Sequence, residues 1–122
     1  MATAADIMKG GHSAMSARAI NGQIQSSITA AGTVITDATD LTASINVVTT
    51  AAASTGVQLQ NCEIGDSVEI LNLGANAVTI YPDSSSNRIN ALSAGGGFLL
   101  ATNTAVVLRK FTSSRWIGFL SA

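Results

Sequence analysis

Apolar and polar residues alternate in short runs along most of the chain after residue 25, and Gly, Asn, Ser and Pro separate these runs. The clearest run starts at Val68, crosses Gly74-Ala75-Asn76 and continues to Tyr81, where Pro82 follows. Alternation places successive side chains on opposite faces of a β-strand, and a proline cannot donate to a strand ladder. The three-residue connection with its glycine therefore predicts a β-hairpin over residues 68–81.

Further strands are predicted on both sides of this hairpin. They cover residues 26–35, 41–49, 57–60, 88–92, 98–101, 105–111 and 115–120. In the run 41–49 we expect Leu41, Ala43, Ile45 and Val47 on one face, with Asn46 among the polar residues of the other. About eight short strands predict an all-β fold, a small antiparallel sandwich or a partly closed barrel.

Residues 1–25 differ from the rest of the chain. Gly10-Gly11 interrupts any helix, and Asn21-Gly22 favours a turn. The larger apolar side chains are too scattered to form a core of their own: Ile7, Met8, Met15 and Ile20. We therefore expect an extended N-terminal arm over residues 1–25 that contacts neighbouring subunits through these four residues, and a β domain over residues 26–122. A disordered leader is the alternative.

Composition favours an assembly over an isolated enzyme. Hydrophobic residues make up 47% of the 122 residues, but aromatic residues only 4%, and much of the remainder is alanine. Alanine buries little area, so packing against other subunits would supplement a light core. Charged residues make up 11% and the net charge is -1, without the clustered Lys and Arg that a nucleic acid requires. No apolar run approaches about 18 residues, so no transmembrane helix is predicted.

A search for reactive groups predicts no catalytic, metal or cofactor site. His12 is the single histidine and lies in the arm, where no rigid partner would hold it as a base. Cys62 is the single cysteine, which excludes an intrachain disulfide, and a half-buried inert thiol is expected in preference to a reactive one. The chain is therefore expected not to be an enzyme.

Two groups of carboxylates and one glycine run are candidate binding sites. Asp37 and Asp40 share one predicted turn, and residues 63–69 carry three more acidic side chains. Solvated turn residues are the favoured interpretation, over a bound calcium ion or an acid pair for sugar cleavage. Gly95-Gly96-Gly97 lacks the Lys-Ser/Thr that follows a phosphate-binding loop, so a flexible connection is expected.

Aromatic residues are the remaining candidates for binding. Core packing is the default for Trp116 and Phe119 near the end of the chain. The alternative places Trp116, together with Tyr81, at a partner interface on the body of the domain.

The second half of the chain, about residues 68–120, resembles a small β domain of virion-associated proteins from tailed bacteriophages. The matching residues are Asn72, Gly74, Asn76, Val78, Ile80, Tyr81 and Pro82, then Ile89, Asn90 and Leu92, and finally Trp116. The closing element departs from the family pattern, because it reads W-I-G-F where an adjacent aromatic pair is usual.

This resemblance implies a capsid decoration (cement) protein, which would bind the major capsid protein on the outside of the virion after synthesis in the host cytoplasm. Such proteins often form homotrimers, and neither a nucleic acid nor a membrane is an expected partner. A tail, neck or fibre accessory protein is the first alternative. A carbohydrate-binding adhesin module is the second, with Tyr81 and Trp116 as its exposed aromatic residues.

Overall fold

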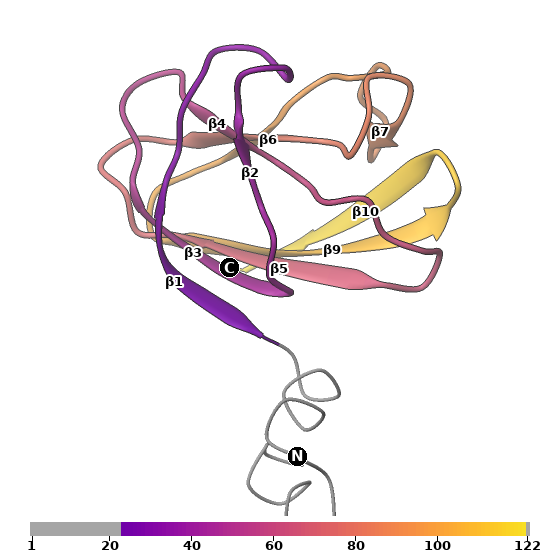
Figure 1. Ribbon diagram of the computed structural model, residues 1–122, viewed down its shortest axis with the longest axis horizontal. Helices are drawn as coiled ribbons and strands as arrows, with labels where there is room; N and C mark the ends of the chain where they lie inside the picture. Colours follow the sequence, from indigo (N-terminus) through magenta and orange to yellow (C-terminus); the bar gives the residue numbers. More distant parts are fainter. Residues whose placement is uncertain (1–22, 122) are drawn as a thin grey trace, which may run out of the picture.

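The computed structural model describes residues 23–121, and within this range the chain forms ten β-strands in two sheets (Figure 1). The strands are β1 (Ile24–Thr29), β2 (Thr39–Asp40), β3 (Ile45–Thr50), β4 (Gly56–Gln58), β5 (Ser67–Asn72), β6 (Val78–Tyr81), β7 (Arg88–Ile89), β8 (Phe98–Leu100), β9 (Thr104–Thr112) and β10 (Arg115–Leu120). The six-stranded sheet has the order β1-β3-β5-β9-β10-β7, and the four-stranded sheet has the order β2-β4-β6-β8.

The first six strands alternate between the two sheets. The strands β1, β3 and β5 stack in parallel in one sheet, and β2, β4 and β6 stack in parallel in the other. Each turn of the chain therefore adds one strand to each sheet. The result is a parallel β-solenoid of about four turns.

The predicted antiparallel sandwich or barrel is wrong, although the all-β class is confirmed. The predicted hairpin over residues 68–81 is wrong as well, because β5 and β6 lie in different sheets. Apolar and polar residues alternate in the same way in parallel and antiparallel strands. The alternation therefore predicted where strands form but not which strands pair with each other. Positions stacked one turn apart, such as Gln25, Asn46 and Ile70, share no residue type that would have revealed the repeat.

Antiparallel pairing begins at the C-terminal end of the solenoid. The strand β8 returns beside β6, β9 returns beside β5, and β10 follows β9 in a hairpin. The strand β10 also pairs in parallel with the short β7. These last strands confirm the three that were predicted after residue 97. They complete the solenoid at one end, while β1 and β2 are the edge strands at the other end.

The core lies between the two sheets and consists of inward-facing residues from both. Its largest fully buried members are Trp116, Leu41, Ile70, Ile80, Ile89, Leu100 and Leu108. Before β3 the predicted alternation changes phase: Leu41 and Ala43 are buried as expected, but Asn46 and Val48 follow them inward. Asn46 Nδ2 donates to the carbonyl oxygens of Ala43 at 2.8 Å and Glu69 at 3.3 Å, while Asn46 Oδ1 has no partner among the described residues.

The corner after β5 explains why the chain turns into the other sheet. A Cβ atom on Gly74 would lie 2.8 Å from Ala51 Cβ and 2.9 Å from Ala51 N. Only glycine permits this close approach between successive turns.

Replacing Gly74 with Ala should therefore lower the free energy of unfolding by about 1–3 kcal/mol, since the added methyl group would overpack the corner. Urea unfolding followed by circular dichroism measures the change. The neighbouring Ala75 is exposed, and Ala75→Ser is the matched control, expected to stay within about 0.5 kcal/mol of the parent. Equal stability of the two variants would contradict this account of the corner.

Candidate functional site

The most distinctive polar feature in the described range is a buried ion pair. Lys110 Nζ lies 2.7 Å from Asp83 Oδ2, and the exposed fractions of the two side chains are only 7% and 3%. Asp83 lies just beyond β6, where Pro82 ends the strand. Lys110 occupies an inward position of β9, in line with Val106 and Leu108. Two distant segments thus meet through opposite charges in the interior.

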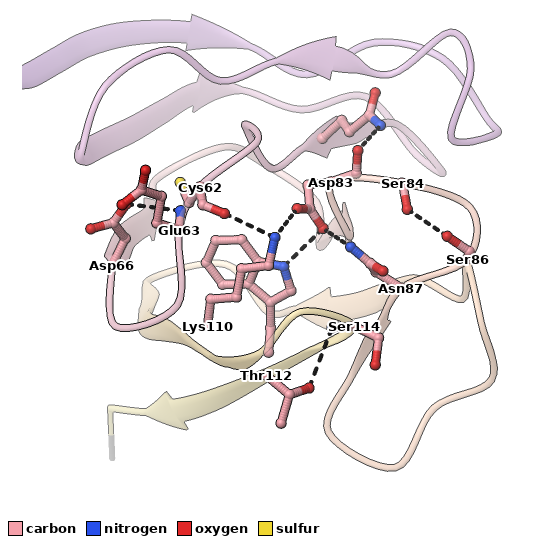
Figure 2. Close-up of polar contacts among 12 residues, drawn as sticks. Cys62, Glu63, Asp66, Asp83, Ser84, Ser86, Asn87, Lys110, Thr112 and Ser114 are labelled. Carbon is pink, nitrogen blue, oxygen red and sulfur yellow. Dashed lines mark hydrogen bonds and ion pairs between the residues drawn. The ribbon is translucent and has the colours of Figure 1, made fainter.

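Every side of the Asp83 carboxylate has a donor, as Figure 2 shows for the labelled residues. Oδ1 accepts from Asn87 Nδ2 at 2.7 Å and from Trp116 Nε1 at 3.0 Å, and Oδ2 accepts from Lys110. Lys110 Nζ also donates to the Cys62 carbonyl oxygen at 2.9 Å and lies 5.8 Å from the centre of the Trp116 ring. We refer to Asp83, Asn87, Lys110 and Trp116 as the Asp83 cluster.

The electrostatics of the cluster keep its carboxylate ionised. Burial alone would raise the pKa of Asp83. The hydrogen bonds from Asn87, Lys110 and Trp116, together with the positive charge of Lys110, outweigh burial and lower this pKa below its usual value. A carboxylate whose acceptor positions are filled from inside the protein is a poor general acid and a poor nucleophile. The arrangement fits a structural bridge between the loop after β6 and the strands β9 and β10.

Cys62 lies next to this cluster and is half-buried. Burial raises the pKa of its thiol, the charges of Asp66 and Asp83 raise it further, and Lys110 opposes them. The thiol is therefore protonated at neutral pH, which fits the expected inert cysteine.

The first motif of the phage resemblance forms the corner between β5 and β6. Asn72 Nδ2 donates to the carbonyl oxygens of Asn76 at 2.9 Å and Leu100 at 3.1 Å, and Asn72 Oδ1 accepts from Gly74 N at 2.9 Å. Asn76 Nδ2 donates to the Ala51 carbonyl oxygen at 3.0 Å, on the preceding turn. These side chains satisfy backbone groups that the corner removes from the strand ladder.

The second motif anchors β7 to β10. Asn90 Oδ1 accepts from Gly118 N at 2.9 Å, and Asn90 N donates to the Trp116 carbonyl oxygen at 2.8 Å. Asn90 has a φ of 52°, in the left-handed region where asparagine is tolerated better than most residues. The asparagine residues of both motifs thus hold parts of the fold together through hydrogen bonds to the backbone.

The predicted interface residues fall into three groups. Ile7, Met8, Met15 and Ile20 lie outside the described residues. Tyr81 is half-buried, and its hydroxyl donates to the Thr33 carbonyl oxygen at 3.0 Å. Trp116 is fully buried within the Asp83 cluster, so its ring does not share an exposed surface with Tyr81.

Of the carboxylates considered as metal ligands, Asp37 and Asp66 take part in turns, whereas Asp40 lies in β2 and Glu69 lies in β5. Asp37 Oδ1 accepts from the backbone N–H groups of Thr33 at 3.1 Å and Val34 at 3.0 Å. Asp66 Oδ2 accepts from Glu63 N at 3.0 Å. Across residues 23–121, no three His, Cys, Asp or Glu side chains gather in a way that could hold a metal ion.

Sequence reasoning missed Asp83 and Lys110. A signal for both was present: Lys110 continues an alternating buried run with Val106 and Leu108, and a buried lysine requires a partner. Asp83 directly follows the proline that ends a strand, a position that a turn-forming residue often takes. The pairing itself depends on the solenoid topology.

Comparisons with known proteins place the chain in no family: no family model, no curated protein and no solved structure matches it. The part of the chain that the structure describes contains no helix that is long and apolar enough to cross a membrane.

Replacing Asp83 with Asn should destabilise the protein at pH 7 by about 3–5 kcal/mol, because the Lys110 ammonium stays buried without its counter-charge. The effect should depend on pH. Since the pKa of Asp83 is lower in the folded than in the unfolded state, its stabilisation is complete above the unfolded value of about 3.9 and is lost as the pH falls through the folded value. Acidification below about pH 4 should therefore cost the parent protein more stability than the variant.

Urea unfolding at a series of pH values measures both effects. Glu63→Gln, which removes an exposed carboxylate from the neighbouring loop, is the matched control and should leave stability at pH 7 nearly unchanged. Parallel pH profiles for the parent and Asp83→Asn would contradict the proposed role of the ion pair.

Proposed function

We propose that the protein is a non-enzymatic structural protein of a bacteriophage particle, a decoration (cement) protein that binds the outside of the capsid and bridges its subunits. The observation that carries the proposal is an edge strand without charge or proline, β1, at the start of the described residues. The resemblance of residues 68–120 to virion-associated β domains supplies the phage context.

The edge of β1 is long and open in the described chain. Six residues form the strand, its one partner is β3, and only Ile28 among the six is buried. The sequence I-Q-S-S-I-T contains neither a charged residue nor a proline, two of the usual protections of an exposed edge. Register shifts interrupt its pairing with β3 between Gln25 and Ile28 and between Ile28 and Thr29. Such an edge favours the addition of a strand from another chain, with main-chain hydrogen bonds supplying affinity.

Attachment would then combine two elements at one end of the solenoid. A strand of the major capsid protein pairs with β1, and the arm residues Ile7, Met8, Met15 and Ile20 contact an adjacent capsid subunit. A standard interface buries about 800 Å² per partner, and contacts to two subunits would resist their separation. Bridging of this kind needs a rigid body and no reactive group.

The interior of the protein supports a role without chemistry. The Asp83 carboxylate and the Lys110 ammonium are committed to each other and to neighbouring donors and acceptors. An open, mainly apolar depression of about 480 Å³ lies beside β8, but its lining residues carry no ionisable side chain: Asn90, Ala91, Leu92, Gly97, Phe98 and Leu99. Neither place offers a base beside a nucleophile.

A tail, neck or fibre accessory protein is the second candidate. The parallel solenoid favours it to some degree, because stacked turns suit elongated assemblies. The carbohydrate-binding alternative has weaker support, since it relied on exposed Tyr81 and Trp116 and the Trp116 ring is buried.

Copy number separates the two structural candidates. We expect hundreds of copies in each particle of the phage that encodes the chain, measured by quantitative mass spectrometry of purified virions against the major capsid protein. A few dozen copies would favour the tail or fibre candidate. Absence from the virion would overturn both.

Charge placed on the β1 edge should prevent attachment. Ser26 and Ser27 are exposed, so the double variant Ser26→Lys/Ser27→Lys should fold normally but bind capsids that lack the protein at least tenfold more weakly, a loss of about 1.4 kcal/mol. Co-sedimentation with such capsids measures the binding. The control Ser85→Lys/Ser113→Lys adds the same charge at exposed sites outside β1 and should bind like the parent. Equal binding by both double variants would exclude the β1 edge as the attachment site.

A further inference from the structure

The six-stranded sheet carries apolar side chains on its outer face as well as on the face toward the core. Alternate residues of its strands point away from the core, and on β3, β5, β9 and β10 these include the large apolar residues Ile45, Val47, Leu71, Val107, Ile117 and Phe119. We call these residues, with Glu69 and Arg109 between them, the outer face. Figure 1 shows no described segment crossing over it.

Strand register aligns these side chains into continuous rows. Ile45 pairs with Glu69, Glu69 with Val107, and Val107 with Phe119. In the next row Val47 pairs with Leu71. Phe119 is 57% exposed. Sheets with large apolar residues on both faces are characteristically covered on both, and a contiguous exposed apolar patch marks an interaction surface.

Two opposite charges lie at the centre of this face. Glu69 on β5 and Arg109 on β9 belong to the two middle strands of the sheet. Because Glu69 pairs with Val107 and Arg109 pairs with Ser67, the two charged residues are diagonal neighbours. Both are exposed, and the single ion pair of the described chain is the one between Lys110 and Asp83. The outer face therefore carries one acceptor and one donor for a partner.

We infer that the outer face binds the same face of a second copy of this chain around a two-fold axis. An axis in the plane of the interface, midway between Glu69 and Arg109, brings Glu69 opposite the partner's Arg109 and Arg109 opposite the partner's Glu69. The same operation lays the apolar rows of the two copies against each other as two packed sheets. A self-complementary charge pattern of this kind selects an identical partner.

The area of the outer face determines how stable the dimer should be. Four strands about 4.8 Å apart and about five residues of roughly 3.3 Å each outline a small patch. This outline of about 19 by 17 Å covers roughly 300 Å² per copy and about 600 Å² for both copies, below the about 1,000 Å² of a stable specific interface. The dimer should therefore dissociate on dilution. This pairing uses a different surface from the β1 edge and is independent of the proposed function.

Sedimentation velocity of the full chain over a wide concentration range tests the inference. The mass should rise from 12.3 kDa toward twice that value. Glu69→Arg alone and Arg109→Glu alone should each weaken self-association at least tenfold, because like charges then face each other. An equimolar mixture of the two variants should restore the dimer, since every Arg then faces a Glu.

Controls separate loss of the interface from loss of the fold. Glu63→Arg makes the same charge change in an exposed loop and should dimerise like the parent. Phe119→Ser should also be monomeric, and circular dichroism verifies that each variant is folded. A parent that stays at the monomer mass, one that reaches three times that mass as a trimer would, or a mixture that stays monomeric would each overturn the two-fold arrangement.

Discussion

Each corner of the solenoid removes backbone groups from a strand ladder and places them beside the core, where each must find a partner. Asparagine side chains meet much of this need. Asn72 and Asn76 bond three carbonyl oxygens and one N–H group around the corner after β5, and Asn90 holds Gly118 N beside β7. An unpaired buried amide costs free energy comparable to a lost hydrogen bond. These few side chains therefore satisfy the backbone groups at the corner after β5 and beside β7.

The Asp83 cluster likewise provides partners for polar groups, at the end of the solenoid where the parallel strands stop. There β9 runs antiparallel to β5, β10 runs antiparallel to β9, and the loop after β6 has no ladder to join. Asp83 ties this loop to Lys110 and Trp116 on the two strands. A buried ion pair adds little net stability compared with apolar packing, but a misplaced partner is expensive. Its value here is to define one position for the loop.

The sequence predicted local structure well and long-range pairing poorly. Alternation located the strands at residues 98–120 because it depends only on which side chains face inward. The sequence predicted a hairpin for β5 and β6 because they are joined by a short connection that contains glycine. The same kind of connection can reverse the chain within one sheet or carry it to the other sheet. Asn46 was assigned outward from its polarity, whereas its amide bonds to two carbonyl oxygens inside. Asp83 and Lys110 are 27 positions apart, so only the topology brings them together.

The sparse charge of the chain follows from how its surfaces are built. A solenoid has two broad sheet faces and two ends, and only the end near β7 and β10 is completed by antiparallel strands. The β1 edge offers directional hydrogen bonds, while the outer face offers apolar area with one charge of each sign. Strand addition and sheet packing use perpendicular directions, so the two proposed contacts involve different surfaces of one copy. Heavy charge would protect both surfaces from contact, and the chain lacks it where contact is proposed.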